Sequence, residues 1–344
     1  MTVVSKNLPL NEVRLTRLAG DDWRHLKNVV LPAFKTSNIK KAFPMMKECV
    51  EECFGVIDSK LPTSTSEPGD GCVELFEPFC NMAADFGLQM FAGARTQIQR
   101  EDGAATAIAH AARQSVGQFG GVALFLLNLL PDIPLLHRVL VGLRSLFIPL
   151  PSDEMMDRML PIINHRRAHP DPSKEDVLQL LINAEVEDAN AASKAEGKKL
   201  SDVFMAHPAT LRTESNTCIF IIASIEAIAS PLAFGCYLLS EHPEVQDRVR
   251  AEVLGLVEKE GALTYDNIGT LTYLGQVLSE VVRLYPALPG SIRRICDEDY
   301  EHNGVRILKG MNVSVPTLDL HYDPELWPEP KKFDPERLAD VFFL

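Results

Sequence analysis

The sequence has 344 residues, of which 46% are hydrophobic and 24% charged, so a disordered chain is excluded and one large or two small domains are possible. It carries 34 Lys and Arg residues against 47 Asp and Glu residues, and the net charge of -13 argues against a nucleic-acid partner. The 7 cysteines form no compact framework, and residues 1–20 contain no apolar run long enough for a signal peptide or anchor. As written, the chain is expected to be soluble and cytoplasmic with reduced thiols.

Most of the chain has a helical pattern. Apolar residues recur with a period near 3.6 at 41–58, 73–92, 104–130, 136–148, 154–167, 174–186, 244–259 and 267–285. A polar run at 187–201 predicts a linker.

The segment 217–239 is mostly apolar and long enough to cross a membrane. Glu226 lies near its middle, where a carboxylate costs about 3 kcal/mol on insertion scales, and Pro231 follows. We therefore interpret this segment as a buried central helix.

The pattern changes after Pro286. Two short strands, 300–302 and 305–307, flank Asn303-Gly304, a dipeptide that favours the type I′ turn of a hairpin. Beyond it, Met311, Val313 and Val315 alternate with polar residues, which predicts a half-buried strand. The predicted fold class is mainly α with a small antiparallel β-sheet (α+β).

Two residue pairs have the spacing of metal ligands. His165 and His169 are four apart, but Pro170 ends any helix there and no third ligand is nearby. Cys49 and Cys53 have the same spacing on an apolar-faced helix, where buried thiols are more often packing residues. We expect no metal-ligating residue in either pair.

Glu280 and Arg283 form an i, i+3 pair on a helix. The expected buried stripe of that helix lies on another face and consists of Leu271, Leu274, Leu278, Val281 and Tyr285. Taken alone, such a pair is a solvated surface pair of a few tenths of a kcal/mol, about 0.2–0.5. The features that follow it in the chain favour another interpretation.

The order of these features resembles the cytochromes P450, the haem-thiolate monooxygenases. The pair matches the family's E-x-x-R as Glu280-Val281-Val282-Arg283. Later segments are similar to the family's sheet, its sequel and its P-E-R-F element: Arg294-Ile295-Cys296, Asn303-Gly304-Val305, Lys309-Gly310, His321-Tyr322-Asp323-Pro324, Trp327-Pro328-Glu329-Pro330 and Phe333-Asp334-Pro335-Glu336-Arg337.

The resemblance implies a buried structural triad of Glu280, Arg283 and Arg337 beside the haem pocket. A buried charge triad is tolerable only when its members are mutually paired. Earlier in the chain, residues 20–34 resemble family helix C, which implies that Trp23 and Lys27 bind haem propionates, with Lys27 in place of the family's Arg. Arg294 is implied as a further propionate ligand.

The segment 217–239 resembles family helix I. By that resemblance Ala223 and Ala227 line the distal face of haem, and Glu226 with position 227 forms the catalytic pair that delivers protons. The family pattern has an alcohol after the acid, whereas this chain has Ala227. Ser224, Ser230 or an ordered water would have to supply the hydroxyl.

The resemblance covers nearly the whole chain and lies nearest the animal microsomal branch with the drug-metabolising members and thromboxane synthase. We expect residues 1–344 to be a single incomplete cytochrome P450 domain, from about helix C to the P-E-R-F element. The membrane anchor would precede it. The axial Cys would follow it, so no metal ligand is expected within this chain.

The resemblance implies haem b iron as cofactor, electrons from NADPH through a partner reductase, and insertion of one atom of O2 into a small lipophilic substrate. The parent enzyme would lie on the cytosolic face of the endoplasmic reticulum membrane. Two alternatives stay open. Ala227 favours a haem-thiolate isomerase of lipid endoperoxides, and the missing thiolate favours a non-catalytic truncated remnant.

Overall fold

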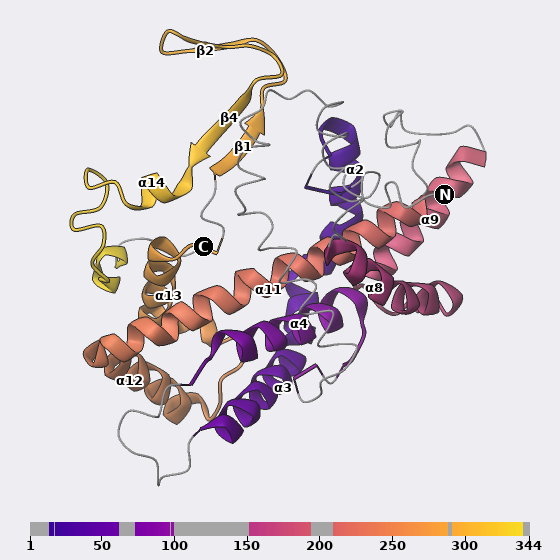
Figure 1. The fold of residues 1–344 in the computed structure, drawn as a ribbon. Coiled ribbons are helices and arrows are strands. Elements are labelled where there is room, and N and C mark those ends of the chain that lie inside the picture. Colours follow the sequence, from indigo (N-terminus) through magenta and orange to yellow (C-terminus); the bar gives the residue numbers. More distant parts are fainter. Residues whose placement is uncertain are drawn as a thin grey trace. The chain divides into compact units, whose positions relative to one another are not determined.

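The computed structural model describes residues 14–16, 18–61, 73–96, 98–99, 151–193, 209–287 and 291–339 (Figure 1). The chain divides into two compact units, Met1–Ala229 and Ser230–Leu344, and the boundary falls inside one long helix. The helices predicted at 104–130 and 136–148 lie outside the described residues. The single domain inferred from the resemblance stays a prediction.

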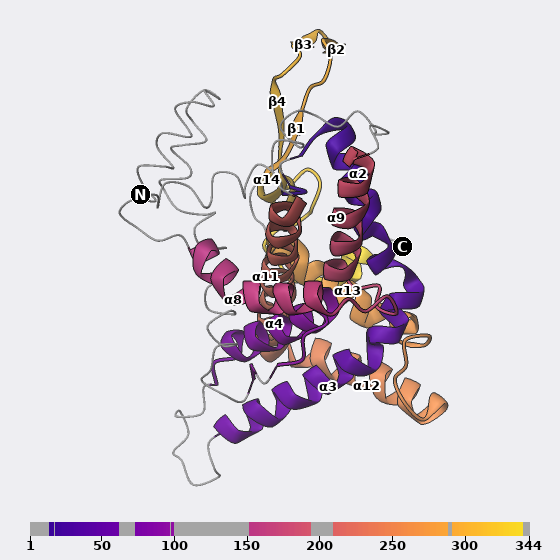
Figure 2. The same cartoon turned by 90° about the vertical axis from the view of Figure 1, so that its right-hand side faces the viewer.

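Every regular element in the described part of the first unit is a helix. Its elements are α2 (Gly20–Val30), the 3-10 turn η1 (Leu31–Phe34), α3 (Thr36–Lys60), α4 (Phe76–Ala92), α8 (Pro151–Ala168) and α9 (Val177–Ser193). The helices predicted within these ranges are therefore confirmed. Helices α3 and α4 lie side by side, and α2 lies beside α9 (Figure 2).

The linker predicted at 187–201 is wrong in its first part, because α9 continues to Ser193. Polar composition misled the prediction. Asp188 is polar, but it pairs with Arg212 and His25 and so is part of the packed helix instead of a solvated loop.

The interface of α3 and α4 forms part of the core of the first unit. Cys49 and Cys53 of α3 are 3% and 2% exposed, which confirms that these thiols are packing residues. Helix α4 ends at Gly93, whose φ of 60° is left-handed. A Cβ at Gly93 would lie 2.5 Å from Arg166 Nη2 and 2.6 Å from Asp176 Oδ2. Glycine therefore also lets the side chains of Arg166 and Asp176 approach the end of α4 closely.

The long helix α11 (Ala209–Glu241) begins earlier than the apolar segment 217–239 that predicted it. Its first turns are polar in sequence yet buried. Asn216 donates to the carbonyl of Arg212 at 2.8 Å, and Thr217 donates to the carbonyl of Thr213 at 2.8 Å. These local hydrogen bonds satisfy the polar side chains and let α11 start two turns early.

Helix α11 is the one described helix long and apolar enough to cross a membrane by length and composition. Ile221, Ile225 and Ala229 are fully buried, so one side of it is a core face. Only 44% of its most apolar window is buried, however. The prediction of a buried central helix is therefore correct for one face and wrong for the other.

The second unit packs α11 with α12 (Pro243–Glu260) and α13 (Thr272–Leu284), which follows the 3-10 turn η3 (Ile268–Thr270). Its core consists of Leu238, Val245, Tyr273, Val277, Val281, Leu284 and Phe333. Leu278, expected on the buried stripe of α13, is 40% exposed. The buried face of α13 is rotated toward Glu280, because this carboxylate and not Leu278 meets the following segment.

The strands form two antiparallel two-stranded sheets. β2 (Tyr300–His302) pairs with β3 (Val305–Ile307) around Asn303 and Gly304, whose φ angles of 51° and 78° confirm the predicted type I′ hairpin. β1 (Ser291–Ile295) pairs with β4 (Asn312–Pro316), and the hairpin extends beyond this pair (Figure 1). A mainly helical fold with small antiparallel sheets is thus confirmed.

The strand β4 exists as predicted, but it is not half-buried. Val313 and Val315 are 38% and 43% exposed, and Ile292 on the paired strand is 53% exposed. The alternating pattern correctly predicted a strand with one apolar face. No described element covers that face in this unit.

Candidate functional site

A buried charge cluster centres on Glu280 of α13, whose side chain is fully buried. Arg283, one turn along α13, donates from Nε to Oε2 and from Nη2 to Oε1, each at 2.8 Å. Arg337 of the 3-10 turn η4 (Pro335–Leu338) donates from Nε to Oε1 at 3.0 Å. The structure therefore brings the three residues of the expected triad together, with Glu280 between the two guanidinium groups.

The remaining donors of the two arginines find backbone carbonyls. Arg283 Nη1 donates to the carbonyl of His321 at 2.7 Å, and Arg337 Nη1 donates to that of Pro328 at 2.8 Å. The backbone N–H of Asp334 adds a third donor to Glu280 at 3.2 Å. One carboxylate and two guanidiniums are thus satisfied by each other and by the chain segment around them.

The residues that follow β4 complete this arrangement. Helix α14 (Thr317–His321) ends beside α13, where His321 Nδ1 lies 2.9 Å from the carbonyl of Arg283 and the Tyr322 hydroxyl donates to that of Leu284 at 2.6 Å. The ring of Trp327 lies 5.1 Å from the guanidinium carbon of Arg283. The sequence placed these residues in a motif but gave no sign of what they contact.

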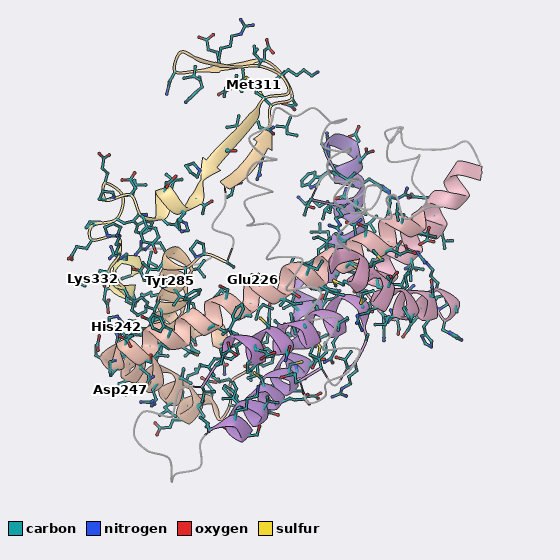
Figure 3. All side chains as sticks on the ribbon, in the orientation of Figure 1. Glu226, His242, Asp247, Tyr285, Met311 and Lys332 are labelled. Carbon is teal, nitrogen blue, oxygen red and sulfur yellow. The ribbon has the colours of Figure 1, made fainter. Side chains whose placement is uncertain are left out.

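The middle of α11 presents an open face of small side chains. Ala223 and Ala227 are exposed, and Glu226, which Figure 3 labels on α11, is partly buried. Ser224, considered as a source of the missing hydroxyl, donates to the carbonyl of Ile221 at 2.8 Å. It also faces α4, since a Cβ at Gly87 would lie 2.4 Å from its Oγ. Ser230 is 6% exposed.

Helix α2 carries Trp23 and Lys27 one turn apart. The Lys27 ammonium lies 4.6 Å from the Trp23 ring centroid, and Trp23 is 37% exposed. Two acidic residues, Asp21 and Asp22, occupy the first turn of α2, where the helix dipole favours them. Arg294 is exposed on β1 opposite Val313. Trp23 and Lys27 belong to the first unit and Arg294 to the second.

The thiols differ in environment. Burial, followed by the charge of Asp85, raises the pKa of Cys49 to about 12, and burial raises the pKa of Cys218 to about 12. The partly exposed Cys296 lies 2.8 Å from the carbonyl of Glu298.

Within the described residues no group of three or more His, Cys, Asp or Glu side chains could bind a metal ion. His165 and His169 stack at 4.8 Å.

We compared these residues with what each of the two sides of a haem ring requires. The distal side fits, because the exposed Ala223 and Ala227 in the apolar part of α11 leave space for a flat apolar ring, and the exposed Lys27 offers a cation for a carboxylate. The proximal side requires a thiolate. Cys49 and Cys218 are buried in helix packing, where their thiols contact Asp85 and Met156, so neither faces such a ring.

Comparison with known proteins agrees with this reading of the residues. Cytochrome P450 3A13 of Mus musculus is 38% identical over 175 residues, covering 51% of this chain and 32% of that protein. Lithocholate 6-beta-hydroxylase of Mesocricetus auratus is 28% identical over 328 residues, covering 94% of this chain and 60% of that protein. The chain thus spans between about a third and three fifths of these relatives.

A solved structure shares the fold. Retinoic acid bound cyanobacterial CYP120A1 superposes with a TM-score of 0.67 and 23% identity, covering 97% of this chain and 65% of that structure. The family model for cytochrome P450 matches residues 5–341, nearly the whole chain. This chain therefore belongs to the cytochrome P450 family.

Proposed function

We propose that the protein is a haem-dependent monooxygenase, which inserts one oxygen atom from O2 into a small lipophilic substrate. The observation that carries this proposal is the open face of Ala223 and Ala227 in the middle of an apolar helix. Such a face suits a flat cofactor with an apolar substrate beside it. Family membership and the Glu280 cluster support the same assignment.

The bound haem b would supply the oxygen activation and atom transfer. Trp23, Lys27 and Arg294 would hold its propionates, with cationic and N–H donors that pair with carboxylates. Ala223 and Ala227 would leave room above the ring. Glu226 is the residue of this face that can hold and move a proton, because Ala227 has no hydroxyl and Ser224 donates to Ile221.

The proposed partners follow from this assignment. Electrons would come from NADPH through a separate reductase, and the thiolate from a cysteine outside residues 1–344. The intact protein would lie on the cytosolic face of the endoplasmic reticulum membrane, anchored by a segment outside this chain. In our proposal α11, the one helix in the described part of the chain that is long and apolar enough to cross a membrane, is not that anchor, because its buried face belongs to the core.

A reduced carbon monoxide difference spectrum of the full-length protein tests the proposal. We expect a thiolate-type Soret band and NADPH-dependent incorporation of 18O from O2 into a lipophilic product. Ala227→Trp should fill the open face and lower the haem content of the purified protein. Ala251→Trp, at an exposed position of α12, is the matched control and should leave haem content unchanged. Absence of the band contradicts the proposal and favours a non-catalytic remnant.

One observation favours a second function. The position after Glu226 is Ala227, and the neighbouring Ser224 hydroxyl donates to the carbonyl of Ile221 within α11, so a proton relay through an alcohol is missing from these residues. Rearrangement of a lipid endoperoxide needs no such relay and no reductase. Turnover of an endoperoxide without NADPH would support this isomerase, and ordinary NADPH-dependent oxygenation would exclude it.

A further inference from the structure

Three aromatic rings from three elements of the first unit meet in one cluster. Phe34 lies in η1, Phe91 in α4 and Phe220 in α11. The ring centroids of Phe34 and Phe91 lie 5.8 Å apart, and each of these two rings lies 5.6 Å from that of Phe220. At such distances each pair of rings attracts beyond the burial of its apolar area. The cluster therefore joins η1, α4 and α11.

One turn away from this cluster, α4 and α11 approach each other closely. Gly87 lies one turn before Phe91 on α4. Ser224 lies one turn after Phe220 on α11. A Cβ at Gly87 would lie 2.4 Å from Ser224 Oγ and 3.7 Å from the Cα of Ile221. Two contacts one turn apart restrict both the rotation of α11 about its axis and its position along α4.

The rotation of α11 decides which of its faces is open. Phe220, Ala223 and Ala227 have the i, i+3, i+7 spacing that places residues on one face of a helix. Phe220 is partly buried within the cluster, whereas Ala223 and Ala227 are exposed. The cluster thus lies at the N-terminal end of the open face of α11.

Phe34 is connected rigidly to α2. Leu31, the residue at which α2 passes into η1, has helical dihedral angles of -53° and -37°. Pro32 restricts the backbone further, because its ring locks φ. The first extended residue is Lys35, which follows Phe34 and has a ψ of 143°. A displacement of the Phe34 ring therefore moves the last turn of α2, which carries Lys27.

We propose that Phe34, Phe91 and Phe220 form an aromatic clamp that fixes the distance between α2 and the open face of α11. The three are positioning residues, and through Phe34 they set how far Lys27 lies from Ala227. The consequence for haem binding rests on the proposed function, in which Lys27 holds a propionate and Ala227 leaves room above the ring. Phe34 is 38% exposed and Phe91 is 7% exposed, so Phe34 can be replaced with the smaller loss of core packing.

The distance between two spin labels, measured by pulsed electron paramagnetic resonance on the full-length protein without added haem, tests the clamp. The labels are attached to p-acetylphenylalanine in place of the exposed Asn28 on α2 and of Ala227 on α11, which leaves the cysteines unlabelled. We expect one narrow distance distribution. Phe34→Leu removes two ring pairs and should shift and broaden this distribution, with displaced α2 about tenfold more populated. Phe34→Tyr keeps the ring and should preserve the native distribution.

Two further variants separate the clamp from a general loss of stability. Phe220→Leu should shift the distance as Phe34→Leu does, and the double variant should shift it by less than the sum, because each change alone breaks the ring pair that they share. Phe54→Leu, at a 56% exposed position of α3, is the matched control and should leave the distance unchanged. An unchanged distance in Phe34→Leu, or an equal shift in Phe34→Tyr, overturns the clamp. The Soret band of the haem-loaded native protein is measured separately, so failure of the clamp and failure of the proposed function are distinguishable.

Discussion

At the scale of single residues, Glu280 shows why a charge can be fully buried in this protein. Its two oxygens receive hydrogen bonds from Arg283, Arg337 and a backbone N–H, so the cost of removing it from water is offset by paired donors. Removing one member of such a group leaves the others buried without a partner. The energetic penalty for a single substitution is therefore larger than the net stability of the group.

Glu280→Gln should destabilise the second unit by about 3–5 kcal/mol, because two buried guanidiniums lose their counter-charge. Urea denaturation followed by circular dichroism measures this change. The matched control is Glu336→Gln, which breaks the exposed ion pair with Arg248 and should cost less than about 1 kcal/mol. Equal midpoints for the two variants would show that the Glu280 cluster does not stabilise the fold.

Cys49 is a second residue with an environment that sets its chemistry. Its thiol lies 3.6 Å from Asp85 Oδ2, and Asp85 also accepts from Thr96 at 2.9 Å and from Gln89 at 3.1 Å. Burial and then the charge of Asp85 raise the pKa of Cys49 from 9.0 to about 12. A thiol that stays protonated in the folded state can donate to Asp85 but is a poor nucleophile.

The raised pKa of Cys49 predicts a pH dependence of stability. The unfolded chain ionises this thiol first, so its contribution is full below pH 9.0 and is lost as the pH rises toward about 12. The free energy of unfolding of Cys49→Ala should fall less steeply between these values than that of the native protein. Iodoacetamide at pH 8 should label Cys296 and not Cys49 until urea is added, and rapid labelling of Cys49 in the folded protein would contradict the assignment.

At the scale of elements, the first backbone N–H groups of α13 have no acceptor within the helix and donate to a side chain of another helix. Glu252 of α12 accepts from the backbone N–H groups of Tyr273 and Leu274 at 2.9 and 3.0 Å and lies 3.3 Å from the Thr272 hydroxyl. The first turn of α13 has no side-chain cap of its own. This contact sets the start of the helix that carries Glu280 and Arg283.

Glu252→Ala should destabilise the second unit by about 1–2 kcal/mol, the range of a strong N-cap. The same denaturation experiment measures it. Glu258→Ala, at an exposed position of the same helix, is the control and should change stability by no more than about 0.5 kcal/mol. If both variants behave alike, Glu252 is not the cap of α13.

At the scale of the whole molecule, the two units share one helix. The boundary between Ala229 and Ser230 falls inside α11, which is a continuous helix of 33 residues. Helix formation is cooperative, so each half of α11 depends on the other and on the packing of both units.

Separate expression of residues 1–229 and 230–344 should therefore give less helix in total than the intact chain. Far-ultraviolet circular dichroism of the two pieces, summed and compared with the intact chain, measures the difference. A sum equal to the intact spectrum would show that α11 can be divided without loss. Cutting between Gly261 and Ala262, in the exposed loop after α12, interrupts no helix and should lose less of the signal.

The sequence by itself determined the features that depend on local periodicity and on short motifs. These include the helices predicted in described parts of the chain, the Asn303-Gly304 hairpin, the order of motifs from Glu280 to Arg337 and hence the family. Each depends on residues close together in the chain, for which helix and turn preferences are sufficient.

Only the tertiary structure decided which side of each element is covered. It showed that Leu278 and β4 are exposed, that the polar start of α11 is helical, and that α11 has an open face at Ala223 and Ala227. It also joined His25 to Asp188 and Glu252 to α13. These contacts link residues far apart in sequence, and their energies depend on burial and on partners that no local pattern specifies.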